Sequence, residues 1–172
     1  MQMYEIDYDA LKGLQVAMER APAVTMRELE AAVTEADVLL QREVIDGEAM
    51  QKAKASGLLA QSIFHTEEVS QNRVLGLVST PLAYALPVEI GTKPHFPPLE
   101  PLIDWVKVKL NISGEKEARG VAFLIARKIS RQGTKGQRPF GQAFDANQEQ
   151  VAAIFARAGE RIAAAIPGGA AA

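Results

Sequence analysis

The stretch YALPVEIGTKPHFPP, residues 84–98, divides the chain into two parts of different character. Its first half alternates in a way that is typical of a strand, which we expect over residues 85–90. Pro87 would remove one ladder hydrogen bond, so this strand is expected at a sheet edge or at a bulge. Gly91-Thr92 predicts the exit from the strand, because glycine adopts positive φ without steric cost. The double proline that follows suits the first turn of a helix.

Upstream of this stretch lies the clearest helical pattern of the chain, residues 22–45. Its apolar residues are spaced by three and four, as in an amphipathic helix: Met26, Leu29, Val33, Ala36, Leu40 and Val44. Pro22 suits the first turn, so an earlier helix beginning at Asp9 is expected to end before it, and Asp46-Gly47 is expected to stop the long helix. Residues 4–8 alternate with acids and predict a short strand or an extended arm.

A β-hairpin is expected between the long helix and residue 84. Residues 56–69 and 73–80 are its strands, and the polar turn Ser-Gln-Asn joins them. Together with residues 85–90 they predict a small antiparallel sheet of three to four strands. Such a sheet needs a cover for its apolar face, and the long helix supplies one.

Downstream of residue 98 the pattern becomes helical again. Three helices are expected, over residues 99–110, over residues 115–129, and from Pro139-Phe140 to about residue 162. With 172 residues, the chain has the length of one domain or of one domain with an insertion. These elements predict an α+β fold.

Charge is distributed unevenly along the chain. Residues 1–50 carry 11 acids and 4 bases, a net −7, whereas residues 51–138 carry 13 bases and 7 acids, a net +6. Complementary surfaces of this kind suit contacts between copies of a chain. Solvated helix faces that happen to differ in sign explain the same numbers, and the sequence leaves both interpretations open.

The composition excludes several kinds of site. The chain has no cysteine, so disulfides, cysteine-ligated zinc and thiol nucleophiles are excluded. No apolar run approaches the roughly 18 residues that span a bilayer, and residues 1–10 lack the features of a signal peptide. We therefore expect a protein of the cytoplasm that has no membrane partner.

Few residues have the arrangement that catalysis requires. His65 and His95 are the only histidines, and neither has the spacing of a metal site or of a catalytic pair. Glu89, Glu100 and Asp104 could supply two carboxylates for acid–base chemistry, although acids lie this close by chance in many chains. We expect no enzyme activity, no cofactor and no small-molecule substrate.

Positive charge is clustered between the second and third of the helices predicted downstream of residue 98. The segment 127–138 contains five basic residues and no acid, and it includes two glycines that predict a loop; the basic residues are Arg127, Lys128, Arg131, Lys135 and Arg138. The loop could contact DNA phosphates, the acidic helix of a neighbouring copy, or only solvent. It does not match a phosphate-binding glycine motif.

Three groups of residues resemble a known family. Tyr84-Ala85, Val88-Glu89 and Gly91-Thr92 resemble its Y-A-x-x-V-E-x-G-T signature. The segment Ser-Gly-Leu-Leu at 56–59, followed by Ser62-Ile63, resembles its lead-in to the hairpin, and Pro139-Phe140 before Ala143 resembles its start of the last helix. The family comprises the head–tail joining and tail-completion proteins of long-tailed phages, related to the minor tail protein Z of phage lambda.

This resemblance implies a function without catalytic residues. It implies one domain over residues 1–172 with a helical insertion at about 98–133, located in the virion neck or upper tail after assembly in the host cytoplasm. The protein would form a homo-oligomeric ring and contact connector, tail-terminator or tail-tube proteins, and passing DNA could touch it. The alternative from a different class is a small nucleic-acid-binding module that uses the basic loop 127–138.

Overall fold

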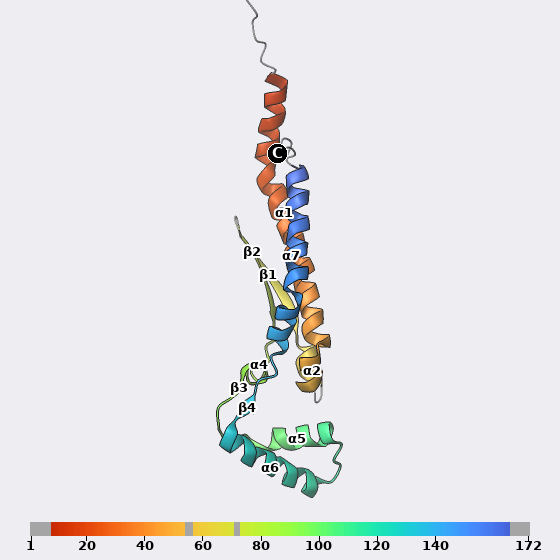
Figure 1. Cartoon of the computed structure of the whole chain (residues 1–172), viewed down its shortest axis with the longest axis vertical. Coiled ribbons are helices and arrows are strands. Elements are labelled where there is room, and N and C mark those ends of the chain that lie inside the picture. The colour runs from red at the N-terminus through yellow and green to blue at the C-terminus, as the bar shows by residue number, and fades with distance from the viewer. Residues whose placement is uncertain (1–7, 54–56, 71–72, 166–172) are drawn as a thin grey trace, which may run out of the picture. The chain divides into compact units, whose positions relative to one another are not determined.

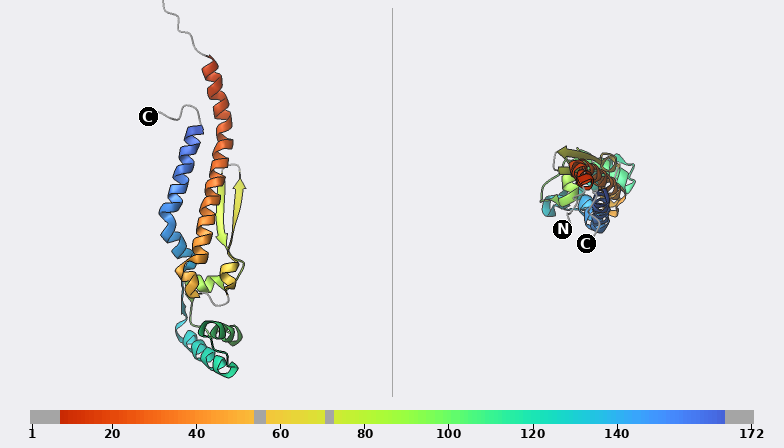
Figure 2. Two further views of the ribbon diagram at one scale, coloured as in Figure 1. Left: turned by 90° about the vertical axis from the view of Figure 1, so that its right-hand side faces the viewer. Right: turned by 90° about the horizontal axis from the view of Figure 1, so that it is seen from above.

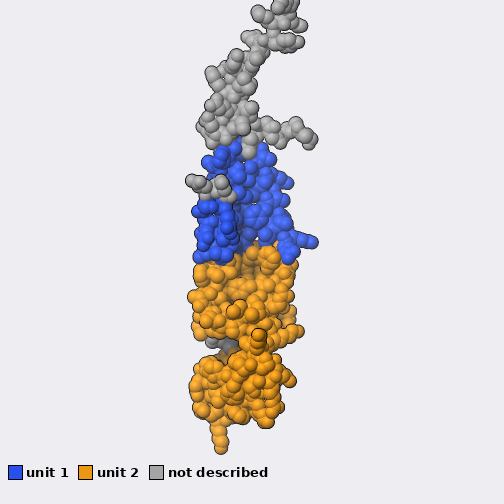
Figure 3. Space-filling model, turned by 90° about the vertical axis from the view of Figure 1, so that its left-hand side faces the viewer, with its two compact units in different colours: residues 1–38, 66–77, 148–172 blue, residues 39–65, 78–147 orange. Residues whose placement is uncertain are grey.

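The computed structural model describes residues 8–53, 57–70 and 73–165, with side chains from residue 21 onward. The chain forms two compact units (Figure 3). Unit 1 comprises residues 1–38, 66–77 and 148–172, and unit 2 comprises residues 39–65 and 78–147. The long first helix, both strands of the hairpin and the last helix each contribute residues to both units. The α+β class predicted from the sequence is confirmed.

The elements follow one another in the order shown in Figure 1. The helices are α1 (Tyr8–Asp46), α2 (Glu48–Ala53), α3 (Leu58–Gln61), α4 (Ala85–Ile90), α5 (Leu99–Leu110), α6 (Glu115–Gln132) and α7 (Pro139–Ala165). The strands are β1 (Phe64–Ser70), β2 (Arg73–Ser79), β3 (Gly91–Thr92) and β4 (Thr134–Lys135). β1 and β2 form the expected hairpin, while the predicted strand or arm at the N-terminus lies mostly outside the described residues.

The expected helix break before Pro22 is wrong, because α1 continues through this residue. Proline keeps a helical φ, but it lacks an N–H donor and its ring clashes with the carbonyl four residues earlier, which together cost about 3 kcal/mol in a helix interior. A helix of 39 residues has enough further hydrogen bonds to offset that cost. The expected stop is confirmed: α1 ends at Asp46, and Gly47 donates its backbone N–H to the Glu43 carbonyl oxygen at 2.9 Å.

The predicted third strand is also wrong, since residues 85–90 form helix α4. The apolar positions Ala85 and Val88 are three residues apart, so a single helical turn places both against the core. Pro87 is the third residue of this helix, where a backbone N–H has no intrahelical acceptor and is not missed. The interpretation of Pro87 as a mark of a sheet edge therefore fails.

A single sheet of three to four strands is not formed by the described residues. β1 pairs with β2 in one two-stranded sheet, and β3 pairs with β4 in another. The N-terminal part of the first predicted strand is instead the short helix α3, and residue 56 of that prediction lies outside the described residues. The basic segment 127–138 is only partly a loop, because α6 continues to Gln132.

In unit 1, α7 lies beside α1 (Figure 2). Arg157 donates to Glu35 at 2.8 Å, and Arg161 donates to Glu28 at 2.7 Å, so the two helices run antiparallel. The hydrogen bond from Arg161, assisted by one from Arg27, lowers the pKa of the Glu28 carboxyl below its ordinary value. Part of the acidic surface of α1 is therefore neutralised within the chain.

The core of unit 2 consists of two apolar clusters. The first joins the end of α1 to α2, α3, α4 and the start of α7, and its buried members are Val44, Met50, Leu59, Ile63, Ala85 and Ala143. The second lies between α5 and α6, where Ile103 and Val106 pack against Ala118 and Ala122. Alanines on α6 let the two helix backbones approach closely. The helix at 99–110 matches the sequence prediction, and the helix predicted over 115–129 extends to Gln132.

Gly76 and Gly120 have opposite packing environments, one crowded and one open. A Cβ on Gly76 of β2 would lie 2.2 Å from the Asp37 carboxylate, and Asp37 is buried and cannot turn into solvent. A Cβ on Gly120 of α6 would have no atom within 4 Å. Gly76→Ala is expected to destabilise the protein by about 1–3 kcal/mol through overpacking. Gly120→Ala is expected to stabilise it by about 0.5–1 kcal/mol, because alanine favours the helix. Urea denaturation measures both, and equal stability of the two variants would contradict this packing.

Candidate functional site

The residues of the resembled signature lie where the chain leaves α4 through β3 and where it returns through β4 to start α7. We call this region, residues 88–92 and 133–141, the joint. β3 and β4 are antiparallel at this joint, with Gly91 opposite Lys135 and Thr92 opposite Thr134. The two threonine hydroxyls are 3.0 Å apart, and the Thr134 backbone N–H also donates to Thr92 Oγ1. The pair of short strands thus ties the two connections to α5 and α6 together.

Backbone hydrogen bonds continue the joint beyond the two strands. The N–H of Gln137 donates to the Val88 carbonyl oxygen at 2.8 Å, and the N–H of Arg138 donates to the Glu89 carbonyl oxygen at 3.1 Å. These bonds use the carbonyls at the C-terminal end of α4, which have no partner inside a helix. The segment before α7 is therefore fixed against α4.

The carboxylate of Glu89 caps α7. Its two oxygens accept hydrogen bonds from the backbone N–H groups of Phe140 and Gly141, each at 2.9 Å. These N–H groups belong to the second and third residues of α7 and have no intrahelical acceptor. A negative charge at this place also complements the positive end of the helix dipole.

Glu89 supplies the hydrogen-bond acceptor that the residues next to the start of α7 lack. The residue that precedes Pro139 is Arg138, whose side chain cannot accept a hydrogen bond as serine, threonine, aspartate or asparagine does at a helix start. Arg138 instead pairs with Asp145 of α7 at 3.1 Å. The lack of a local capping residue was the only sequence signal for this contact, and it did not identify Glu89 as the partner.

Gly91 has no room for a side chain. Its φ is 82°, and a Cβ would lie 2.2 Å from the carbonyl oxygen of Thr134. Gly133, on the opposite side of the joint, has a φ of 70°, and a Cβ there would lie 2.0 Å from the carbonyl oxygen of Thr92. The Gly-Thr pair of the signature is therefore explained by the close approach of two backbone segments.

Beside the signature residues, α4 and α7 carry exposed apolar side chains, whereas Phe140 is partly buried against the first core cluster. Ala85 is buried in the core, whereas Tyr84 is 46% exposed. Leu86 and Ile90 lie one turn apart on α4 and are 62% and 69% exposed, and Phe140 and Phe144 lie one turn apart on α7. A hollow of about 460 Å³ includes Leu86, Glu89 and Phe140 in its lining. We refer to Leu86, Ile90, Phe140 and Phe144 as the apolar patch.

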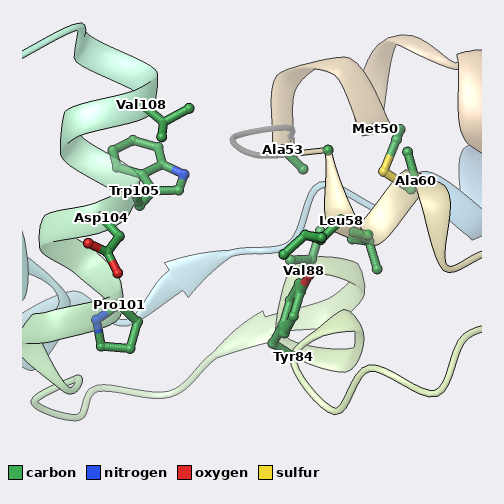
Figure 4. Close-up of a pocket in the computed structure, with 12 residues that line it drawn as sticks. Met50, Ala53, Leu58, Ala60, Tyr84, Val88, Pro101, Asp104, Trp105 and Val108 are labelled. Atoms are coloured by element: carbon green, nitrogen blue, oxygen red, sulfur yellow. The ribbon is translucent and has the colours of Figure 1, made fainter.

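A second hollow lies between α5 and the segment from α2 to α4 (Figure 4). Its volume is about 410 Å³, and apolar side chains face it from both sides, among them Met50, Val88 and Trp105. Asp104 is the one carboxylate in its lining. The hollow can accept an apolar group, and the titratable side chains among its described lining residues are Tyr84 and Asp104.

The three acids considered for catalysis have separate environments. Glu89 binds two backbone N–H groups, Glu100 pairs with Arg119 at 3.2 Å, and Asp104 lines the second hollow. The ring Nδ1 of His95 lies 2.9 Å from the Lys93 carbonyl oxygen, and the ring Nδ1 of His65 contacts the Gln41 side chain. Within the described residues, no three histidine or acidic side chains cluster in a way that would hold a metal ion.

The basic residues of segment 127–138 do not form one loop. Arg127, Lys128 and Arg131 line a shallow polar hollow on α6 together with Leu124 and Gln132. Lys135 is exposed on β4. Arg138 pairs with Asp145, so it belongs to the joint. The predicted basic site is therefore a feature of the α6 surface.

Comparison of the chain with known proteins identifies no relative. The chain matches no known family model, no curated protein and no solved structure. In the part of the chain that the structure describes, no helix has the length and apolar character needed to cross a membrane.

The geometry of the joint predicts that substitutions at Gly91 and His95 have unequal effects on stability. Gly91→Ala is expected to destabilise the protein by about 2 kcal/mol or more, because alanine would be strained at positive φ and would overlap a backbone oxygen. His95→Ala is expected to change stability by less than about 0.5 kcal/mol, since His95 is exposed. Urea denaturation followed by circular dichroism compares them. A Gly91→Ala protein as stable as the His95→Ala protein would show that the close approach is not required.

Proposed function

We propose that this chain is a structural protein of a tailed-phage neck or upper tail, which works by assembly. Copies of the chain would associate with one another and with connector, tail-terminator or tail-tube proteins, and would join or complete the tail. The motif residues support this proposal through their positions, because they build a rigid joint and leave an apolar surface beside it. The resemblance of these residues to the phage family supplies the biological setting.

The observation that carries the proposal is the apolar patch. Leu86 and Ile90 are each more than 60% exposed although both lie on a short helix that is fixed by the joint. Leu86 and Ile90 lie one turn apart on α4, so their exposed side chains are neighbours, and contiguous exposed apolar side chains are typical of a protein interface. Burial of such side chains against a partner contributes about 1.5–3 kcal/mol each.

Fewer acidic side chains of α1 are available for contacts between copies than the sequence indicated. Glu28 and Glu35 on α1 are paired with Arg161 and Arg157 of α7 in the same chain. These acids are therefore less available to a neighbouring copy. Apolar contacts, rather than opposite net charges, are the main stabilising interaction that we propose for the assembled state.

The self-association of the wild-type chain and of two double variants tests the proposal. The wild-type chain is expected to form oligomers of defined mass as its concentration rises, measured by mass photometry and gel filtration. Leu86→Gln with Ile90→Gln is expected to raise the dissociation constant at least about a hundredfold, because two buried side chains are lost. The control removes two exposed aliphatic residues of α5 instead, Val108→Gln with Leu110→Gln, and is expected to assemble normally.

Two results would contradict the proposal. One is a wild-type chain that stays monomeric at every concentration and also when phage tail proteins are added. The other is a Leu86→Gln, Ile90→Gln protein that assembles as the wild-type chain does.

A further inference from the structure

The outward face of α6 carries an unusual group of side chains. At 100° per residue, Phe123, Arg127 and Arg131 follow one another along this face, and Leu124 and Lys128 lie directly beside them. The opposite face is buried through Ala118, Ala122 and Ala126. Because the buried face fixes the orientation of α6, all three basic side chains point to the same side of the helix, and all three are exposed.

These three cations have no acidic partner among the residues that the structure describes. Arg127, Lys128 and Arg131 share a shallow hollow whose other lining residues are Leu124 and Gln132. Many basic side chains elsewhere in the described residues are in ion pairs: Arg27, Arg42, Lys52, Lys107, Arg119, Arg138, Arg157 and Arg161. Three cations within five residues repel one another, so an anion that binds all of them relieves a real electrostatic cost.

A second copy of the chain is a poor source of that anion. Its acid-rich segment is α1, and the structure uses acids of α1 internally: Glu28 and Glu35 bind arginines of α7, and Asp37 is buried. An external polyanion is therefore the better partner. Nucleic acid presents closely spaced negative charges along a line, about one for each 1.7 Å of a duplex, and a row of cations on a rigid helix matches such a line.

We propose that this face of α6 binds the phosphate backbone of duplex DNA without reading its sequence. A single strand is bound mainly through stacking of its bases on exposed aromatic faces. Phe123 of α6 is 49% exposed and its ring lies against that of Phe96 at a centroid distance of 6.2 Å, so the comparison of duplex with single strand is part of the test. The surface is separate from the apolar patch, so DNA binding and self-association succeed or fail independently.

Fluorescence anisotropy with a labelled duplex of mixed sequence tests the proposal on the full chain. The wild-type protein is expected to bind with a dissociation constant of about 10⁻⁶–10⁻⁴ M, and to lose affinity steeply between about 50 and 200 mM salt. The triple variant Arg127→Gln, Lys128→Gln, Arg131→Gln is expected to flatten the slope of log affinity against log salt by about 2.7, which corresponds to three phosphate contacts.

A matched control removes the same amount of charge from another part of the surface. Arg27→Gln, Arg42→Gln and Lys52→Gln replace three exposed cations that are paired in the structure and lie on α1 and α2, and this variant is expected to keep the wild-type salt slope. Acetylation of lysines in the unaltered chain gives an independent measurement: DNA is expected to protect Lys128 and not Lys52. This measurement remains informative if the triple variant does not fold.

Four results would overturn the proposal. They are no duplex binding by the wild-type chain at low salt, equal loss of binding in the two triple variants, tighter binding to a single strand of the same length, and equally tight binding to polyglutamate. The last result would assign the face to an acidic protein partner.

Discussion

The contact between the Glu89 carboxylate and the start of α7 is the interaction on which unit 2 depends. Glu89 is 51 residues from Phe140 and 52 from Gly141 along the chain, yet its two oxygens bind the N–H groups of both. A buried or half-buried helix end without an acceptor costs about 1–3 kcal/mol for each unsatisfied group. The carboxylate removes that cost and at the same time fixes the position of α7 relative to α4.

The joint around Glu89 explains how a helical pair can lie between α4 and α7 without loosening them. The chain leaves through β3 and returns through β4, and these strands pair over two residues each. Their closeness requires glycine at Gly91 and Gly133, where a Cβ would overlap the opposite backbone. Beyond this joint, α5 and α6 have their own apolar cluster, and α6 presents the basic surface that we assign to DNA, whereas the apolar patch lies on α4 and α7. A rigid joint beside exposed apolar and basic surfaces suits a protein that acts through its contacts.

The sequence predicted the elements whose pattern repeats over many residues. The helices at 99–110 and 115–129 were predicted because their apolar stripes extend over three turns or more, and the hairpin was predicted because both strands flank a polar turn. Residues 85–90 were assigned wrongly because six residues fit both alternation and a single helical turn. Pro22 was given too much weight, since a long helix tolerates one missing bond.

The cap on α7 could not be predicted in the same way. Its donor groups and its acceptor lie more than 50 residues apart, and no periodicity connects Glu89 with Phe140. The signature residues around Glu89 indicated an important position, but the nearest physical explanation from the sequence was an edge strand. The cationic residues of α6 were recognised as a group, whereas their placement on a helix face required the structure.

Amide hydrogen exchange at Phe140 and Gly141, followed by NMR in the wild-type chain and in Glu89→Ala, tests the cap most directly. Both N–H groups are expected to exchange slowly in the wild-type chain, because each is hydrogen-bonded to the carboxylate. In Glu89→Ala, which has no side-chain acceptor, they are expected to exchange much faster, while amides in the middle of α6 keep their protection. Equal protection of Phe140 and Gly141 in the two proteins would contradict the account, because the first turn of α7 would then have another acceptor.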